Sequence, residues 1–418
     1  MRTMKRVAAV ALSVVVLMTS GVSAKAAVTD VQPAKSSSEA VLKWAKKVGE
    51  PFDEKTYANN TVSKIKLVGN YLYVADDAKH RIMKIDKKDG TILKEQKYCD
   101  ESYIQGYVSS IGYGDGKVYV GYDNGRVQAF DENTLESLWI TDENKNAINS
   151  DFVFTNGKLY FGTTAKTTDW YDNGAPFSYY VVTTSDDDKT KPDEEKTMKK
   201  VVESKTGKFY LKKGVVLGKY IVISDTAGTL TMIDTTNDKV TDTKDIGEAF
   251  SGNITYDEMT GTIYFVAGTN DLYGIKVSAD GKLKDEKKVR LYETGYSSTT
   301  PEVYNGKVYV SGSKGKAFQD KGYMAVADVS SGKYKVNYTV ELSNYSQCEP
   351  TIVKTGENSV RVYFTINDEP GGIYAIEDSK DATSATLETV YEPTGDIKNT
   401  GCMSDVVVDE DGTIYFCK

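Results

Sequence analysis

The sequence predicts an all-β protein, an eight-bladed β-propeller whose blades are four-stranded antiparallel sheets. Three observations lead to this prediction: a recurring turn-and-strand unit, alternating strands after it, and tight-turn dipeptides between the strands. The unit is clearest as Gly-Lys-Val-Tyr-Val at Gly116–Val120 and again at Gly306–Val310. Repeats of about forty to fifty residues that carry several strands are typical of propeller blades.

The unit recurs eight times and usually carries Tyr in one slot. The slot residues are Tyr73, Tyr119, Tyr160, Ile221, Tyr264, Tyr309, Tyr363 and Tyr415. They stand 41 to 61 residues apart, and the longest step, from Tyr160 to Ile221, lies in the third repeat. Eight such strands predict eight blades. Seven blades are the alternative count, because only seven units are followed by further strands.

Each of the first seven units is followed by an alternating segment such as Gly322–Asp328, which predicts a half-buried third strand. Asp-Gly and Asn-Gly pairs, for example Asn305-Gly306, favour hairpins because these residues tolerate positive φ. The eighth unit ends at Lys418 without such a segment. We therefore expect Val41–Val48, which carries Trp44, to form the outer strand of the last blade and to close the ring. The eighth blade then holds three strands, or the natural protein continues beyond this sequence.

The N-terminal residues have the pattern of a secretory signal peptide. Basic residues open 1–24, an apolar run from Val7 to Met18 follows, and the segment ends in small residues. The run is too short for a membrane span. We expect a signal peptide at 1–24, a flexible lead-in at 25–39 and one propeller domain at 40–418. With no cysteine before Cys99, a secreted or cell-surface protein that is not a lipoprotein is predicted, without a transmembrane segment.

The charge pattern argues against nucleic acid as a partner. The formal net charge is -8, and the charged residues, 27% of the chain, are scattered in both signs. Nucleic-acid binding generally needs a basic stripe. A mixed Asp, Glu, Lys and Thr run at 185–200 is expected to be a solvated hairpin tip.

One stretch carries a recognisable family pattern. Ala129-Phe-Asp131-Glu-Asn-Thr134-Leu-Glu-Ser-Leu-Trp139 resembles the eleven-residue motif of the PQQ-like repeat, or quinoprotein-alcohol-dehydrogenase-like, propellers. In that family the motif is structural, which implies that Asp131 and Thr134 shape a turn and that Trp139 docks between blades. Trp44 is the other Trp expected to dock. Here Leu135 replaces the Gly of the motif.

The same resemblance implies a quinone-dependent dehydrogenase as one possible activity, and we rank it last. Such enzymes hold the quinone with adjacent cysteines, a stacking Trp and calcium-ligating acids. The cysteines of this chain are Cys99, Cys348, Cys402 and Cys417, none adjacent, so no cofactor is predicted. Cys348 and Cys402 stand at corresponding places in neighbouring blades. We favour free or buried thiols there over a disulfide.

Loops between blades, together with the loops between second and third strands, generally form the ligand face of a propeller. Exposed aromatic rings beside short polar groups suit a sugar or a peptide. The candidates on this face are Trp170, Tyr171, Tyr103, Tyr107, Tyr296, Tyr345 and Glu349. The alternative for the tyrosines is packing between blades.

Catalytic residues are scarce, so no catalytic residue and no metal site are predicted. His80 is the one histidine and is expected at the surface, which leaves no Ser-His-Asp set and no histidine-ligated metal. Paired carboxylates for glycoside cleavage stay open. The prediction is a secreted binding or scaffolding propeller for extracellular carbohydrate or protein. The alternative is a secreted polysaccharide-cleaving enzyme.

Overall fold

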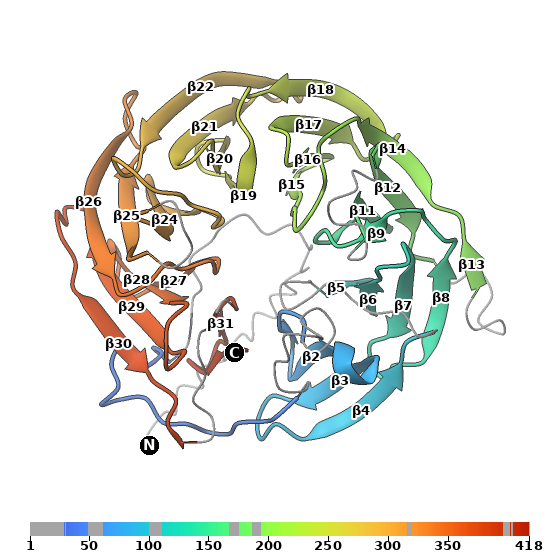
Figure 1. The fold of residues 1–418 in the computed structure, drawn as a ribbon, viewed down its shortest axis with the longest axis horizontal. Coiled ribbons are helices and arrows are strands. Elements are labelled where there is room, and N and C mark those ends of the chain that lie inside the picture. The colour runs from blue at the N-terminus through green and yellow to red at the C-terminus, as the bar shows by residue number, and fades with distance from the viewer. Residues whose placement is uncertain are drawn as a thin grey trace, which may run out of the picture.

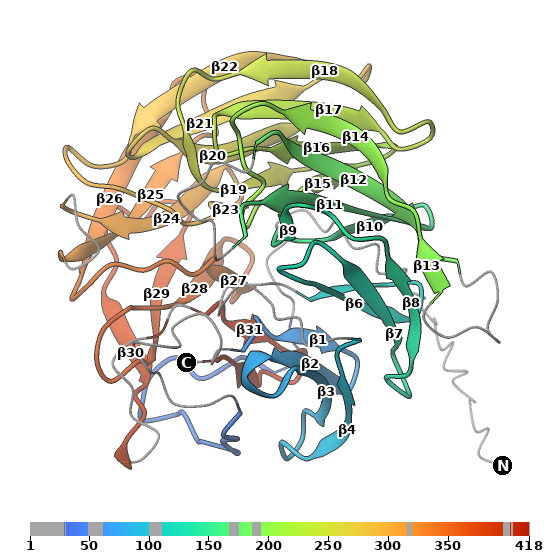
Figure 2. The same ribbon diagram turned by 45° about the vertical axis from the view of Figure 1, so that its right-hand side comes forward.

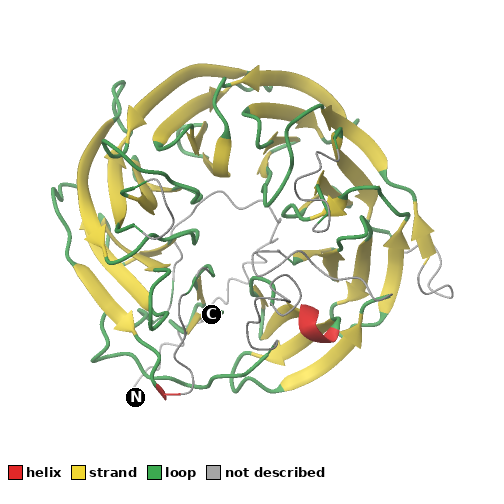
Figure 3. Cartoon of the chain, in the orientation of Figure 1, coloured by secondary structure: helices red, strands yellow, loops and turns green. Residues whose placement is uncertain are grey.

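The structure is a computed structural model that describes residues 29, 31–48, 62–99, 111–166, 175–185, 194–315, 320–395, 402 and 404–417. Strands dominate it (Figure 3). Eight sheets surround a central axis and follow one another in chain order, so that the first and last sheets lie side by side (Figure 1). The predicted all-β, eight-bladed propeller is confirmed. No helix in these described ranges is long and apolar enough to cross a membrane.

Each sheet is one blade, and its first strand lies nearest the axis. Blade one contains β1 (Lys66–Val68), β2 (Tyr71–Asp76), the short 3-10 helix η1 (Asp77–Lys79), β3 (Arg81–Asp86) and β4 (Ile92–Lys97). Blade two contains β5 (Gly112–Gly114), β6 (Lys117–Gly121), β7 (Val127–Asp131) and β8 (Ser137–Thr141). Blade three contains β9 (Ala147–Ile148), β10 (Val153–Thr155), β11 (Lys158–Thr164), β12 (Phe177–Thr183) and β14 (Lys199–Ser204). Blade four contains β15 (Val215–Leu217), β16 (Tyr220–Ser224), β17 (Thr229–Asp234) and β18 (Lys239–Asp245).

The second half of the ring continues the pattern (Figure 2). Blade five contains β19 (Phe250–Asp257), β20 (Thr262–Ala267), β21 (Asp271–Val277) and β22 (Leu283–Arg290). Blade six contains β23 (Glu302–Tyr304), β24 (Lys307–Ser313), β25 (Gly322–Asp328) and β26 (Lys335–Leu342). Blade seven contains β27 (Thr351–Lys354), β28 (Ser359–Thr365), β29 (Ile373–Ser379) and β30 (Leu387–Tyr391). Blade eight contains β31 (Val407–Val408) and β32 (Ile414–Tyr415).

The hydrophobic core lies between the blades. Second strands such as β24 are buried along their whole length, whereas outer strands such as β26 alternate between buried and exposed residues. One cluster joins Tyr309 and Met324 of blade six to Ile352 of blade seven. Each sheet therefore buries its apolar side chains against the next sheet, which stabilises the ring by about 25 cal/mol for every Å² of apolar surface removed from water.

Several of the repeated tyrosines, though not Tyr119, have a common purpose at these seams. Tyr309 Oη donates a hydrogen bond to Asp378 Oδ2 of the next blade at 2.7 Å, and Lys307 Nζ lies 2.9 Å from the same carboxylate. Tyr160 Oη likewise donates to Asp238 Oδ1 of the next blade at 2.6 Å. The ring fills the space between blades while its hydroxyl is satisfied by the neighbour, so a buried polar group is not left unpaired.

The turn of the repeat motif in blade two is built by local hydrogen bonds. Asp131 Oδ1 accepts from the backbone N–H groups of Asn133 and Thr134, each at 2.8 Å. Leu135, which replaces the Gly of the motif, has φ of 59°. Trp139 is fully buried, and its ring centroid lies 5.7 Å from that of Tyr119, in a cluster shared with blade three.

The charged run at 185–200 in the third repeat is predicted to be a solvated hairpin tip. This prediction is wrong at the C-terminal end of the run. Residues Glu194–Lys196 form β13, which pairs in parallel with β8 and makes blade two five-stranded. The outer edge of β8 offers unpaired backbone groups that an extended segment can satisfy. Lys196 Nζ also lies 5.7 Å from the centroid of the Trp139 ring. Residues 186–193 lie outside the described ranges.

The strand predicted at Val41–Val48 is wrong, although the segment lies beside blade eight as expected. Its residues form no strand, yet the Trp44 ring lies 6.2 Å from that of Tyr415, much as Trp139 faces Tyr119. Trp44 Nε1 donates to the Lys87 carbonyl of blade one at 3.0 Å. An outer strand needs a third strand to pair with, and in the described part of the chain none pairs with the outer edge of β32.

Candidate functional site

The first strands of the sheets line the axis of the propeller, and their common register brings equivalent side chains to one level. In every blade, one residue of the first strand pairs with the slot residue of the second strand. In six blades, a polar or charged residue stands two positions before that first-strand residue. These residues are Lys64, Asp151, Asn253, Thr300, Glu349 and Asp405. They sit where the chain enters each blade, next to the loops that join the blades.

Ion pairs connect this level around and across the axis. Lys64 Nζ lies 2.8 Å from Asp405 Oδ2, which joins blade one to blade eight. Lys213 Nζ lies 3.2 Å from Glu349 Oε1. Lys213 precedes blade four and Glu349 precedes blade seven, so this second pair spans the central channel. We call the set Lys64, Lys66, Asp151, Lys213, Glu302, Glu349 and Asp405 the channel ring.

The ring also contains two neighbouring carboxyl groups whose pKa values are shifted in opposite directions. Glu302 and Glu349 lie close enough to influence each other's pKa. Burial, and then the Glu349 carboxylate, raise the pKa of Glu302 well above its ordinary value. Burial acts in the same direction on Glu349, but Lys213 and Lys64 outweigh it and lower its pKa to about 2. These shifts favour the protonated form of Glu302 and the charged form of Glu349.

Charge in the ring is nearly balanced, and water can still reach it. Burial raises the pKa of Asp405, and the nearby Lys64 ammonium acts against this shift. The Lys213 and Glu349 side chains keep 38% and 19% of their exposure. Lysine and carboxylate groups therefore lie together at this level of the axis, partly accessible to solvent.

Beside the ring, Lys212 is buried and ties two blades together. Its Nζ donates to the carbonyl oxygens of Phe250 and Gly252, at 3.0 and 2.6 Å. Burial lowers the pKa of Lys212 to about 7. The contact joins the start of blade four to the start of blade five, so its role is structural.

The structure brings one sequence-predicted residue into this site and places two others differently. Glu349 belongs to the channel ring. Tyr345 is 8% exposed and accepts a hydrogen bond from Asn367 Nδ2 at 2.6 Å. Tyr296 is half-buried and bridges Ser313 through its backbone. These two rings do not form an exposed stacking surface. Trp170, Tyr171, Tyr103 and Tyr107 lie outside the described ranges.

Sequence reasoning missed Lys64, Lys213, Glu302 and Asp405. Lys64 and Asp405 stand two positions before the residue that pairs with the slot residue, and this shared level is visible only once the strand register is known. Lys213 and Glu302 do not share this position, because Glu302 itself pairs with Tyr309 and Lys213 lies three positions before Val216, the partner of Ile221. Cys348 and Cys402 are buried thiols and form no disulfide with each other. Burial raises the pKa of Cys348 to about 11.

The ring is poorly arranged for glycoside cleavage. Retaining enzymes need carboxyl groups about 5 Å apart and inverting enzymes need about 6.5 to 9.5 Å. Glu302 and Glu349 lie close enough to influence each other's pKa, and Glu349 is also ion-paired with Lys213 at 3.2 Å. His80 ends η1 and packs edge-on against Tyr98 in blade one, away from the ring. Within the described ranges, no cluster of His, Cys, Asp and Glu side chains is suited to hold a metal ion.

The channel residues do not fit the quinone that the family resemblance implies. An ion pair between Lys213 and Glu349 spans the channel, and a planar cofactor at that level would have to break it. The four cysteines are separate in the sequence, so the adjacent pair of the dehydrogenases is missing. We derive no redox step from this site.

Comparison with known proteins supports the fold alone. No family model and no curated protein sequence matches the chain. BamB from Moraxella catarrhalis superposes with a TM-score of 0.57 at 13% identity, over 84% of this chain and 95% of that one. A quinohemoprotein alcohol dehydrogenase from Pseudomonas putida HK5 gives 0.63 at 12% identity, over 92% and 73%.

A computationally designed protein, Ika8, gives a TM-score of 0.54 at 11% identity, over 85% of this chain and 96% of that one. These identities are too low to carry an activity from one protein to another. The resemblance inferred from the eleven-residue motif is confirmed at the level of architecture: the chain has the β-propeller fold that BamB and the quinohemoprotein alcohol dehydrogenase share.

Proposed function

We propose that this chain is an exported binding or scaffolding propeller that recognises an extracellular protein with the mouth of its central channel. It works without a cofactor. The observation that carries the proposal is the channel ring, in which lysines from blades one and four meet carboxylates from blades seven and eight. The channel ring presents positive and negative charges together. This arrangement complements a polypeptide segment, which also carries charges of both signs.

The pairing within the ring favours binding over catalysis. Asp405 and Glu349 each have a lysine partner, and Glu349 also neighbours Glu302, whose pKa is raised. A catalytic acid or base must be free to exchange its proton with a substrate. Groups that already satisfy one another form instead a rigid, preorganised surface, which reduces the entropy lost when a ligand binds.

A peptide selection tests this proposal. The chain without residues 1–24 is exposed to a phage-displayed random-peptide library and, separately, to a glycan array. Binding is then compared in Lys213→Met and in Lys321→Met. The second variant is a matched control, because Lys321 forms a comparable ion pair with Glu341, 2.8 Å long, on the outside of blade six. Circular dichroism confirms that both variants are folded.

We expect selected peptides to lose at least about tenfold in affinity for Lys213→Met, which is ~1.4 kcal/mol, and none for Lys321→Met. Peptides that bind both variants as well as the wild type would place the site elsewhere. Glycans that bind the wild type and Lys321→Met but bind Lys213→Met more weakly would show that the ligand is a carbohydrate and not a protein. Binding to neither probe would overturn the proposal.

A further inference from the structure

Among the described residues, blade eight lacks the third strand that every other blade has. Its sheet consists of β31 and β32, and in the described part of the chain nothing pairs with the outer side of β32. Asp409 N donates to the Thr413 carbonyl at 2.9 Å. Because antiparallel ladders alternate, the backbone groups of Tyr415 face β31, while those of Ile414 and Phe416 face outward.

The far side of this position is also occupied by the chain. Tyr363 Oη donates to the Ala34 carbonyl at 3.0 Å, in the place where other slot tyrosines reach the turn before the outer strand of the next blade. Trp44 then faces Tyr415 as Trp139 faces Tyr119. Residues 33–44 therefore follow the course of a fourth strand, with the third one missing between them and β32.

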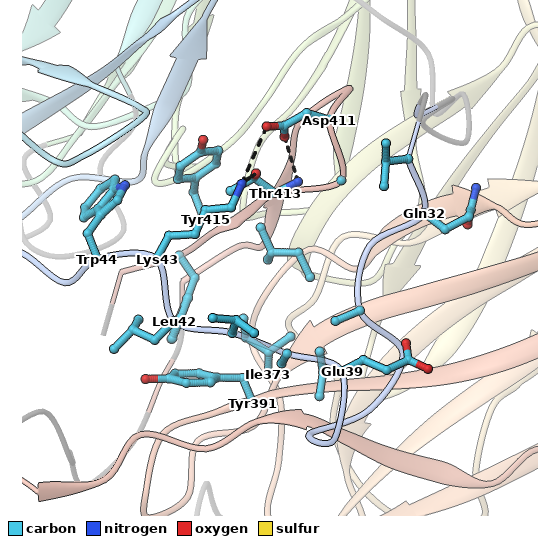
Figure 4. A pocket seen from close by; sticks show the side chains of 18 of the residues that line it. Gln32, Glu39, Leu42, Lys43, Trp44, Ile373, Tyr391, Asp411, Thr413 and Tyr415 are labelled. Carbon is cyan, nitrogen blue, oxygen red and sulfur yellow. Dashed lines mark hydrogen bonds and ion pairs between the residues drawn. The ribbon is translucent and has the colours of Figure 1, made fainter.

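A pocket of about 330 Å³ marks this gap (Figure 4). We call it the third-strand slot. Its lining is mostly apolar and includes Val41, Leu42, Ile373, Val390, Ile414 and Phe416. Val41 and Leu42 are 83% and 50% exposed, which is unusual for aliphatic side chains this close to a hydrophobic core. The lysine in the lining, Lys43, already pairs with Asp411 at 3.7 Å.

We propose that the third-strand slot receives an extended segment of a partner protein, which pairs with β32 and completes blade eight. The seven other blades show what fits such a position. Their third strands, such as β7 and β25, are five to seven residues long and carry apolar side chains on buried faces. No described residue pairs with the outer backbone groups of β32, and the lining of the slot is mostly apolar with its charges paired. The partner segment is therefore uncharged and alternates apolar residues. Strand addition of this kind obtains its affinity from backbone hydrogen bonds and its specificity from side-chain pockets.

The chain itself supplies the probe. A synthetic peptide of residues 320–331 contains β25, which pairs in its own blade with the second strand β24. The control peptide carries Ala325→Pro, since proline cannot donate to a ladder. Hydrogen exchange of the Ile414 and Phe416 amides reports pairing directly, and fluorescence anisotropy of the labelled peptide gives its affinity. We expect these amides to exchange at least about tenfold more slowly with the peptide, as amides gaining a ladder bond do.

Two lysine variants locate the binding. Val41→Lys introduces a charge into the slot at a side chain that is already exposed, so folding is retained. Val240→Lys is the matched control, because Val240 is a 43% exposed valine on the outer strand of blade four. Lysine at a strand edge opposes pairing, and we expect at least about tenfold weaker binding in Val41→Lys only, or ~1.4 kcal/mol.

Three results would overturn the proposal: unchanged exchange at Ile414 and Phe416, equal affinity of the proline peptide, or binding insensitive to Val41→Lys. A concentration-dependent dimer that Val41→Lys dissociates would assign the slot to a second copy of the chain instead of a partner. None of the variants touches the channel ring, so this proposal and the proposed function can fail separately.

Discussion

Blade two and blade eight show the same repeat with and without its outer half. Blade two has five strands, counting β13, and buries Trp139 completely. Blade eight has two strands, and Trp44 beside them is half-buried. In both, the Trp faces the slot Tyr at a similar distance, 5.7 and 6.2 Å. The Trp–Tyr contact therefore survives without the strand that normally lies between, and ladder hydrogen bonds are not what positions it.

The inner edges of the two blades differ far less than their outer edges. Asp405 of blade eight joins the channel ring through Lys64 although its sheet has only two strands. Two strands are enough to hold a side chain at the axis, because the neighbouring blades support them on both faces. The consequences of an incomplete blade are confined to the rim.

The largest expected effect is that of Trp139→Ala. Removing a fully buried Trp from the core between blades two and three should cost about 3 to 5 kcal/mol of unfolding free energy. Urea titration followed by circular dichroism measures it. A loss below about 1 kcal/mol would mean that β13 and Lys196 hold blade two together without the indole. Blade two could then no longer serve as the complete blade in the comparison with blade eight.

An intermediate effect is expected from Glu302→Gln and depends on pH. The folded-state pKa of Glu302 lies above its ordinary value of 4.5, so above pH 4.5 the unfolded chain releases a proton that the folded chain keeps. Wild-type stability should therefore fall relative to the variant as the pH rises, by at most about 1.4 kcal/mol per pH unit. Gln mimics the protonated acid and removes this slope.

Urea midpoints of both proteins at pH 5, 6, 7 and 8 measure the difference. The variant should match or exceed the wild type at pH 7. Parallel pH profiles would show that Glu302 ionises in the folded protein as it does in the unfolded chain. This experiment sharpens the comparison at the inner edge, where blade eight and the complete blades contribute to one ring.

The smallest effect is expected from Trp44→Ala. Trp44 is half-buried and donates one hydrogen bond, to the Lys87 carbonyl. Its loss should cost about 1 to 2 kcal/mol, since one hydrogen bond contributes about 1 kcal/mol and the ring buries only part of its surface. The same urea titration applies. A cost equal to that of Trp139→Ala would mean that the N-terminal segment seals blade eight as firmly as a regular strand does.

Much of the fold was predictable from the sequence because the repeat unit is local. Turn, Tyr and alternation lie within a few residues of one another, so Tyr309 and its equivalents were found without the structure. The Val41–Val48 prediction failed for a physical reason: a strand exists only with a pairing partner, and composition does not reveal whether one is present. The β13 pairing was missed in the same way, since charged residues can also lie along an edge.

The site was much less predictable. Lys213 and Glu349 are 136 residues apart and belong to blades that are not neighbours. No local pattern signals that their side chains meet. The sequence pattern favours aromatic residues as ligand-binding candidates instead, and one of these, Tyr345, is buried.

The pair between Lys213 and Glu349 bears on how the molecule unfolds. In arrays of repeats, each unit usually contacts only the units beside it, and such chains can open from an end, unit by unit. A bond across the axis ties blade four to blade seven without passing through the blades between. Opening of blade four or blade seven must strain this tie or leave a charge unpaired. These two blades should accordingly open together, unlike the stepwise fraying of a linear array.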